Sequence, residues 1–415
     1  MKIILISVGT RGDIEPFLAI GEILKEKGHQ VICAFPKQFR ELSEDSGLAF
    51  ASLGAKFIEL LDSDVGKAAM GGSSGIKKFL ALIKLARTQN ESQKELANKQ
   101  YEIIESEEPD RIVYNGKAMY PVLWGVTNRG KAILVSPLPY LHYVKGHSHI
   151  AFNSNFGTFF NKLTYSLYYF GIVTTAKITM KWLKLSKISR KQIRNSFLEN
   201  KVIYTISPSL FSRPDYWKGN LKVLGYHEKN KTDIWQPDKE LTDFLTKYEK
   251  ILLITFGSMI NPEPELKTEI IIDILERNNI PGIINSASGG LVKPDKFSSE
   301  LICFVSQIPY DWIFPNVYGV IHHGGSGTTH LSLKYGCATM IIPHIIDQFV
   351  WNKTIYDMGA GPRGVKIGEI TTKNLEPKIL ELVNSNSFKK KAEQIAGQMA
   401  KENFREEIYK AIIEK

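Results

Sequence analysis

Residues 2–10 read KIILISVGT and residues 250–258 read KILLITFGS. These two stretches, which we call the opening stretches of the two halves of the chain, are nearly the same. Five of the nine positions are identical and the other four are conservative. Both stretches are short apolar runs rich in β-forming residues, and both end at Gly followed by a hydroxyl residue. This pattern is typical of a buried parallel strand that enters a tight loop before a helix. We therefore expect two similar α/β domains.

The rest of the chain alternates short apolar runs with helical periodicity. After the first opening we expect helices over 14–27 and 76–106, and strands over 31–35, 112–115, 132–136, 202–207 and 221–224. In the second half we expect strands over 251–256, 282–285, 301–305, 319–322 and 338–342, with helices between them. Such alternation implies parallel sheets with right-handed crossovers. Ligands bind at the carboxyl ends of such strands, where 9–13 and 257–259 lie, so we expect a site in a cleft between the domains.

The composition is that of a globular protein. The chain has 415 residues, of which 43% are hydrophobic and 23% charged, and two domains of about 200 residues each fit that length. Three cysteines, Cys33, Cys303 and Cys337, are too few for a disulfide framework or a Cys-rich zinc site. Each lies in or beside an apolar stretch, so we expect buried free thiols and a reducing compartment, the cytosol.

The sequence predicts no targeting or membrane-spanning segment. The apolar run after Lys2 meets Gly9 within seven residues, which is unlike a signal peptide. The longest uncharged aromatic stretch, 163–176, has 14 residues, whereas a spanning helix needs about 20. We expect a soluble protein that can still touch a membrane.

The net charge of +10 comes from one part of the chain. Residues 111–198 contain 13 Lys and Arg and no Asp or Glu, and the remainder carries 40 basic against 43 acidic residues. The charge is densest in the basic segment (177–194), on an expected helix, at Lys177, Lys181, Lys184, Lys187, Arg190, Lys191 and Arg194. One interpretation is a solvated helix face.

The other interpretation of the basic segment is attraction to anionic lipid, because basic clusters flanked by aromatics suit a membrane surface. Residues 153–170 supply those aromatics, namely Phe156, Phe159, Phe160, Tyr165, Tyr168, Tyr169 and Phe170. Nucleic acid is a weaker option because no nucleic-acid motif accompanies the charge.

The segment richest in chemistry is 321–329, IHHGGSGTT, where a strand ends at His322 or His323 and a helix begins at about Thr328. Glycines let backbone amides approach a ligand closely, and the helix N-terminus adds N–H groups and partial positive charge. This pattern favours a diphosphate site, in which His323 can donate a hydrogen bond to a phosphate oxygen. The alternative is a tight strand–helix turn without a ligand.

Two further loops carry carboxylates at strand ends. Residues 343–348 read PHIIDQ, in which an acid followed by an amide can bind two adjacent sugar hydroxyls. Residues 9–13 read GTRGD, and Asp13, just before a helix, is a candidate general base facing a cleft. For both Asp347 and Asp13 the alternative is a helix N-cap.

Other patterns are discounted. Asp62 and Asp64 form a D-x-D in a polar loop without a partner, which favours a surface turn over a metal site. His142, His147 and His149 lack the ligand spacing of a zinc site. No G-x-G-x-x-G follows either opening strand, and no G-x-x-x-x-G-K-[ST] is present, so a dinucleotide oxidoreductase is disfavoured.

The stretches GTRGDIEP, HHGGSGTT and PHIIDQFVWN together resemble the family 1 nucleotide-sugar glycosyltransferases, in the branch of sterol glucosyltransferases and bacterial macrolide or glycopeptide-antibiotic glycosyltransferases. The resemblance implies the GT-B fold, an α/β fold of two facing Rossmann-like domains with parallel sheets and a cleft between them. We expect an acceptor-binding domain over 1–225, a linker over 226–245, a nucleotide-sugar domain over 246–387, and helices over 388–415 that cross back to the first domain.

The resemblance also implies roles for individual residues. Asp13 matches the catalytic base, His323 the residue that binds the diphosphate, and Ser258 a hydroxyl facing the phosphates. Asp347 and Gln348 match the pair on the sugar hydroxyls. The remaining donor-binding candidates are Thr10, Arg11, Gly12, Gln307, Ile308, Gly325, Ser326, Gly327, Thr328 and Thr329. Plant members stack a Trp on the base, whereas Trp312 of this chain falls later.

The expected function is inverting, metal-independent transfer of a hexose, glucose from UDP-glucose, to a hydroxyl of a lipophilic acceptor such as a sterol or polyketide. No cofactor and no nucleic acid are expected, and the expected location is the cytoplasm, with contact to the inner face of an anionic membrane left open. The alternatives are a sugar-nucleotide epimerase and a non-catalytic sugar-nucleotide-binding protein on the same fold.

Overall fold

The computed structural model describes residues 1–56, 75–152, 154–229, 235–257, 259, 261, 263–286 and 289–414, and of residues 75–89 and 346 only the backbone. These residues fall into two compact units. The first contains residues 1–56, 82–229 and 403–414, and the second contains residues 75–81 and 235–402. Each unit has its own sheet and its own hydrophobic core.

The sheet of the first unit has seven parallel strands in the order β3-β2-β1-β4-β5-β6-β7. Their bounds are β1 (Lys2–Ile6), β2 (Gln30–Phe35), β3 (Ala49–Ser52), β4 (Arg111–Tyr114), β5 (Ala132–Ser136), β6 (Val202–Tyr204) and β7 (Leu221–Val223). Six of these strands coincide with predicted runs. The edge strand β3, whose four residues are exposed or partly exposed, was not predicted.

The sheet of the second unit has five parallel strands in the order β10-β9-β8-β11-β12. Their bounds are β8 (Leu252–Thr255), β9 (Gly282–Asn285), β10 (Ile302–Val305), β11 (Gly319–His322) and β12 (Ala338–Ile341). All five were predicted to within a residue or two. The two similar stretches of sequence form β1, an interior strand between β2 and β4, and β8, the central strand of the second sheet.

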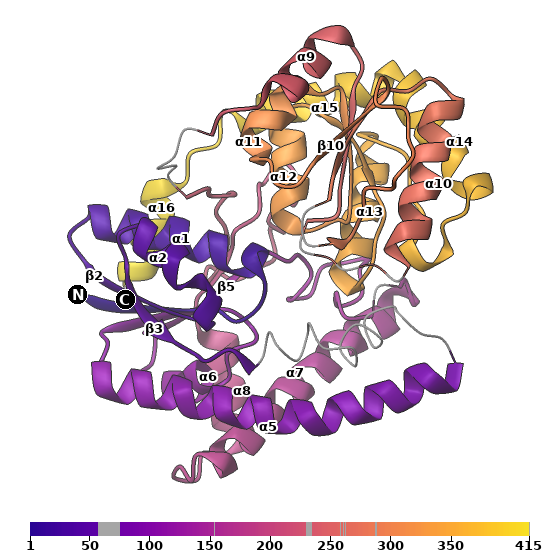
Figure 1. The fold of residues 1–415 in the computed structure, drawn as a ribbon. Coiled ribbons are helices and arrows are strands. Elements are labelled where there is room, and N and C mark those ends of the chain that lie inside the picture. Colours follow the sequence, from indigo (N-terminus) through magenta and orange to yellow (C-terminus); the bar gives the residue numbers. More distant parts are fainter. Residues whose placement is uncertain are drawn as a thin grey trace. The chain divides into compact units, whose positions relative to one another are not determined.

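Helices complete the first unit: α1 (Arg11–Glu26), α2 (Arg40–Asp45), α5 (Gly75–Glu107, of which residues 82–107 belong to this unit), α6 (Tyr120–Thr127), α7 (Gly157–Trp182), α8 (Arg190–Glu199) and α16 (Arg405–Ile413). The C-terminal α16 lies beside α1, and Ile408 and Ile412 are buried in the same core as β1 and β2 (Figure 1). The chain therefore returns to the first unit at about Asn403, later than the expected position 388.

The second unit contains α9 (Lys239–Lys247), α10 (Pro264–Arg277), α11 (Tyr310–Ile313), α12 (Ser326–Lys334), α13 (Ile346–Met358), α14 (Thr372–Asn384) and α15 (Asn386–Met399). Part of the expected linker 226–245 is helix α9, which Asp238 caps by accepting a hydrogen bond from the Leu241 amide at 2.8 Å. Helix α15, expected to cross back, packs against α12 and β12 instead.

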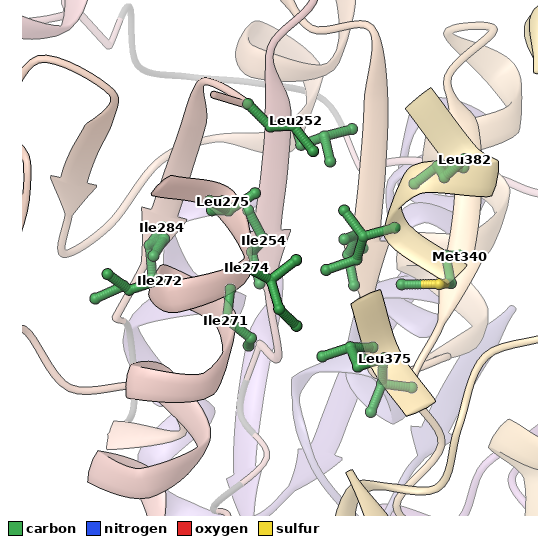
Figure 2. Packing of buried hydrophobic residues seen from close by; sticks show 14 of the residues in the cluster. Leu252, Ile254, Ile271, Ile272, Ile274, Leu275, Ile284, Met340, Leu375 and Leu382 are labelled. Atoms are coloured by element: carbon green, nitrogen blue, oxygen red, sulfur yellow. The ribbon is translucent and has the colours of Figure 1, made fainter. Parts of the chain in front are cut away.

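Aliphatic side chains fill one face of the second sheet. Figure 2 shows α10 and α14 contributing to this core beside the central strand β8. Its labelled members are Leu252, Ile254, Ile271, Ile272, Ile274, Leu275, Ile284, Met340, Leu375 and Leu382. Because the strands are buried on both faces, their sequences are continuous apolar runs.

The basic segment (177–194) is not one helix, as the sequence analysis expected, but the end of α7 followed by a turn and the start of α8. Lys184 adopts a left-handed backbone conformation with φ of 53°, and the Leu185 amide donates to the Met180 carbonyl, which closes α7. Ser189 and Gln192 then form a reciprocal capping box that starts α8. No helix among the described residues is long and apolar enough to cross a membrane.

Candidate functional site

Each sheet has a point at which the order of its strands reverses. In the first unit the chain builds β1, β2 and β3 outward and then returns to place β4 on the other side of β1. In the second unit β11 returns in the same way to the other side of β8. The loops that follow the two strands at such a point lead in opposite directions and leave a crevice, which is where open α/β sheets bind ligands.

In the first unit, Asp13 lies at this point and is part of the N-terminal cap of α1. The helix begins at Arg11, so Asp13 is its third residue and does not precede it as expected. Its Oδ2 accepts a hydrogen bond from the Thr10 amide at 3.0 Å, which is a capping role. The carboxylate nevertheless remains 21% exposed and can reach a ligand. The capping and functional interpretations of Asp13 are therefore compatible.

Lys117, which the sequence analysis missed, holds the Asp13 carboxylate from the other side of the crevice. Its Nζ lies 2.9 Å from both carboxylate oxygens. It follows β4, and Asn115 ties its loop to the first one by donating to Ser7 Oγ at 3.0 Å and to the Val8 carbonyl at 2.8 Å. Lys117 could have been found by asking which polar residues follow the strand that pairs with β1.

The other candidates of this loop are exposed. Thr10, Arg11 and Gly12 lie at the surface of the first unit. The Arg11 guanidinium forms an ion pair with Glu15 one helical turn later, with Nε 2.7 Å from the carboxylate. The backbone around Asp13 is fixed in addition by Ser7, whose hydroxyl donates to the Asp13 carbonyl at 2.7 Å.

A cavity lies next to the Asp13–Lys117 pair within the first unit. Helices α5 and α7 and the loop after β4 line it with a mixture of apolar and hydrogen-bonding side chains, namely Asn90, Gln93, Ala97, Gln100, Lys117, Met119, Thr175, Ile178, Thr179 and Trp182. Lys117 lines the cavity and also pairs with Asp13, so a molecule in this cavity would lie close to the Asp13 carboxylate. Amphipathic lining of this kind suits a largely apolar molecule with a few polar groups.

In the second unit, His323 follows β11 and is nearly buried. It is 9% exposed, and its Nδ1 has no hydrogen-bond partner among the described residues. Burial, with His322 and His344 nearby, holds the pKa of His323 well below its ordinary value. The ring is therefore neutral at physiological pH, with one N–H to donate and one nitrogen that accepts. The unpartnered Nδ1 of His323 is thus a hydrogen-bonding atom that a ligand at the glycine loop could use.

Glycines make room for this imidazole. A Cβ at Gly257, after β8, would lie 3.0 Å from His323 Cε1, and a Cβ at Gly325 would lie 2.5 Å from His323 Nε2. Gly324 has a φ of +94°, and a Cβ there would lie 2.7 Å from Ile341 Cγ2. The Gly324 amide donates to His322 Nδ1 at 3.0 Å, so the paired histidine shapes the loop.

The glycine loop leads directly into α12, which begins at Ser326 and not at the expected Thr328. The first-turn amides of a helix lack intrahelical acceptors and carry partial positive charge, which favours an anion. Residues 325–328 supply this turn, with Gly325 as the N-cap. Thr329 is fully buried and its hydroxyl donates to the Gly325 carbonyl at 2.9 Å, so its role is to hold the loop.

At the start of α13, Gln348 provides the helix cap that the sequence analysis considered for Asp347. Its Oε1 accepts hydrogen bonds from the backbone amides of His344 at 2.7 Å and Ile345 at 3.1 Å. Gln348 is almost fully buried, while Asp347 is partly exposed in the first helical turn. The side-chain nitrogen of Gln348 is the atom that could still serve a ligand.

His344 adds a second buried imidazole near His323, with the ring centroids 6.4 Å apart. Its Nδ1–H donates to the Ile342 carbonyl at 2.9 Å, and its Nε2 contacts the Asn261 side chain. Burial lowers the pKa of His344 to about 4, so this ring is neutral as well. Asn261 also bonds to the Gly290 carbonyl and so anchors the loop after β8.

The remaining candidate residues differ in how exposed they are. Gln307, after β10, is exposed, whereas Ile308 is buried in the core and offers only its backbone. Trp312 packs edge-on against Trp235, with centroids 4.8 Å apart. Ser258 lies outside the described residues, as do Asp62 and Asp64.

Histidines 142 and 149 belong to an aromatic cluster of the first unit. His142 Nδ1 is 2.7 Å from the Tyr204 hydroxyl, and His149 stacks on Tyr168 with centroids 4.0 Å apart. Burial lowers the pKa of each imidazole to about 4. Within the described part of the chain, no group of three or more His, Cys, Asp or Glu side chains is arranged to hold a metal ion.

Two family comparisons cover the ends of the chain. Residues 3–107 match the sequence model of the glycosyltransferase family 28 N-terminal domain. Residues 298–415 match that of the C-terminal domain of proteins like erythromycin biosynthesis protein CIII. The first match includes Asp13, and the second includes His323 and the glycine loop.

Similar proteins extend the match over nearly the whole chain. A sterol 3-beta-glucosyltransferase of Arabidopsis thaliana is 29% identical, with 97% of this chain and 64% of the relative covered. A sterol 3-beta-glucosyltransferase of the yeast Vanderwaltozyma polyspora is 27% identical, with 96% of this chain and 33% of the relative covered. The chain thus spans less than two thirds of the plant relative and a third of the yeast one.

Solved structures share the fold. A glycotransferase of kitacinnamycin superimposes with a TM-score of 0.69 at 14% identity, covering 98% of this chain and 97% of that one. A Streptomyces glycosyltransferase, SsfS6, complexed with thymidine diphosphate, superimposes with a TM-score of 0.63 at 16% identity over the full length of both chains.

The glycine loop generates a first prediction. Gly324→Ala forces a side chain into a left-handed backbone conformation and against Ile341, so the free energy of unfolding of the second unit should fall by about 1–3 kcal/mol. Chemical denaturation measures this change. Gly368→Ala is the matched control, since a Cβ there meets nothing within 4 Å. Equal stability of the two variants would show that the loop around His323 is not confined as described.

Proposed function

We propose that this chain, which belongs to the family 1 nucleotide-sugar glycosyltransferases of the GT-B fold, transfers glucose from UDP-glucose to a hydroxyl of a lipophilic acceptor with inversion at the anomeric carbon. The observation that carries this proposal is His323, a buried neutral imidazole with an unpaired nitrogen beside a glycine loop and a helix N-terminus. The names of the sterol 3-beta-glucosyltransferase relatives support glucose and a lipophilic alcohol.

The donor would bind in the second unit through its diphosphate. His323 would donate its N–H to a phosphate oxygen, and the first-turn amides of α12 would bind further oxygens. Close approach of the backbone is possible because Gly324 and Gly325 carry no side chain. Asp347 and the side-chain nitrogen of Gln348 would bind the sugar hydroxyls, and Gln307 would lie near the base.

The acceptor would bind in the first unit, in the cavity lined by α5 and α7. Asp13 would accept the proton of the acceptor hydroxyl while the oxygen of that hydroxyl attacks the anomeric carbon. The bond from that carbon to the phosphate oxygen breaks, and UDP leaves with the electron pair. Lys117 would keep the carboxylate oriented, since its Nζ contacts both oxygens.

The reaction is proposed to need no metal ion, since His323 and the helix N-terminus can meet the charge that develops on the leaving diphosphate. A lipophilic acceptor also suggests where the enzyme works. We place it in the cytoplasm, in peripheral contact with an anionic membrane in which such an acceptor would dissolve. The excess of basic residues over 111–198 favours this location.

The transferase proposal is tested by incubating the protein with UDP-glucose, with and without a panel of sterols and polyketides, each in the presence and absence of excess EDTA. UDP release should require an acceptor, the glucoside should be detected by mass spectrometry, and both should survive EDTA. Epimerised donor without an acceptor would instead indicate an epimerase, and tight donor binding without turnover on any acceptor would indicate a binding protein. A magnesium-reversible loss in EDTA would contradict metal independence.

Asp13→Asn removes the proposed base while preserving its shape and one hydrogen-bond acceptor. The turnover number should fall by about 10²–10⁴-fold, whereas the dissociation constant for UDP should stay unchanged. Steady-state kinetics and calorimetry measure the two quantities. Glu15→Gln, on the same helix, is the matched control and should keep near-normal turnover. If Asp13→Asn behaves like this control, Asp13 only caps the helix.

His323→Ala should weaken binding of UDP itself, because the proposed partner of the imidazole is the diphosphate and not the sugar. A lost hydrogen bond of about 1–3 kcal/mol raises the dissociation constant roughly 5- to 150-fold. Because burial keeps the pKa of His323 far below neutrality, UDP affinity of the wild type should not change between pH 7 and 8.5. Affinity that declines across this range would mean that a cationic imidazole binds the phosphate.

His29→Ala serves as the control for the calorimetry, since His29 lies in the other unit. Its affinity for UDP should equal that of the wild type. An unchanged dissociation constant for His323→Ala would place the nucleotide elsewhere in the protein.

A further inference from the structure

Helix α7 exposes large apolar side chains along one face. We call this set the α7 stripe, and it consists of Phe156 just before the helix and Phe159, Phe160, Leu163, Leu167 and Phe170 within it. Their exposed fractions run from 44% for Leu163 to 76% for Phe159. Within the helix, successive members from Phe160 onward are three or four residues apart, so they lie on one side of an α-helix. Contiguous exposed apolar side chains of this kind mark an interaction site.

The opposite face of α7 holds the helix on the protein. Tyr165 is buried and donates its hydroxyl to the Ser148 carbonyl at 3.1 Å. Tyr168 stacks on His149, and Tyr169 packs against Phe197 of α8. The aromatic residues that the sequence analysis treated as one group are therefore two groups. The tyrosines pack against other side chains of the first unit, whereas the phenylalanines are exposed.

The basic segment adjoins the α7 stripe. The guanidinium of Arg190, the first residue of α8, lies over the ring of Phe170 at 5.6 Å from its centroid. Lys162 is exposed on the same helix, and further exposed cations follow at Lys181, Lys184, Lys187, Lys191 and Arg194. In the described part of the chain, none of these side chains takes part in a salt bridge, and residues 111–198 contain no carboxylate side chain. The α7 stripe and the basic segment thus meet at Phe170 and Arg190, and we treat them together as one apolar and cationic surface.

We infer that this surface lies in the interface of an anionic bilayer, with the α7 stripe inserted at the boundary of head groups and acyl chains and the basic segment on the lipid phosphates. The inference rests on the membrane association proposed above and deepens it by naming the inserted element. An amphipathic helix with aromatic residues on one face and nearby cations binds membranes in this way. A second copy of this chain is a poor occupant, because it would bring a like-charged surface against this one.

The test compares cosedimentation with phosphatidylcholine vesicles that contain phosphatidylglycerol and with vesicles of phosphatidylcholine alone. The wild type should bind the anionic vesicles strongly at low salt. Part of this binding should persist when salt screens the lysines, because the hydrophobic insertion is insensitive to screening. Phe159→Ser, Phe160→Ser and Phe170→Ser combined should weaken partition on the order of a hundredfold and remove the salt-resistant part.

Two further variants separate the contribution of the lysine charges from that of the exposed phenylalanines. Replacement of Lys181, Lys184, Lys187 and Lys191 by Gln should remove the preference for anionic lipid. Leu266→Ser with Tyr356→Ser removes exposed apolar side chains from the second unit and should leave vesicle binding unchanged. The triple Phe variant should retain transfer to a water-soluble acceptor, which shows that it is folded and separates this test from the test of the transferase function.

Three results would overturn the inference. Equal vesicle binding by the wild type and the triple Phe variant would mean that the lysines alone attract the membrane. Absence of wild-type binding at low salt would contradict membrane association altogether. A wild-type dimer in sedimentation velocity that becomes monomeric in the triple Phe variant would identify a second copy of the chain as the occupant of the stripe.

Discussion

The rest of this structure depends on one constraint. In each sheet a later strand, β4 or β11, pairs with the strand that the chain forms first, β1 or β8. β4 pairs with β1 in parallel, with Tyr114 opposite Ile6, and β11 pairs with β8, with His322 opposite Thr255. Because parallel strands end at the same edge, the loop after the first strand and the loop after the returning strand emerge side by side. This is why Asp13 meets Lys117 in one unit and why His323 packs against Gly257 in the other.

The two crevices differ in the charge of the side chains that line them. In the first unit a carboxylate is partly exposed and held by one cation, so it remains able to accept a proton from a neighbouring hydroxyl. In the second unit, neutral imidazoles, glycines and a helix N-terminus around His323 present donors without a formal charge. Burial is what keeps these imidazoles neutral. A site of this kind can bind a diphosphate without fixing a salt bridge that the departing product would have to break.

Helix α7 connects the proposed chemistry to the proposed location. Its C-terminal half contributes Thr175, Ile178, Thr179 and Trp182 to the cavity beside Lys117, whereas its N-terminal half carries the exposed stripe. One helix would therefore contact the bilayer at one end and the acceptor at the other. A lipophilic alcohol that leaves the membrane along this helix would not need to cross water to reach the Asp13 carboxylate.

The sequence by itself determined the parallel sheets, nearly all their strands, the glycine loop and the candidacy of Asp13 and His323, because these features depend on local periodicity and on residues a few positions apart. Only the tertiary structure decided what depends on distant contacts. Lys117 became a partner of Asp13 through strand order, Gln348 and not Asp347 became the cap through burial, and α16 rather than α15 returned to the first unit through packing. The division of the aromatics of α7 into tyrosines packed on the core-facing side and exposed phenylalanines likewise depended on which face met the core, since composition alone does not distinguish the two faces of a helix.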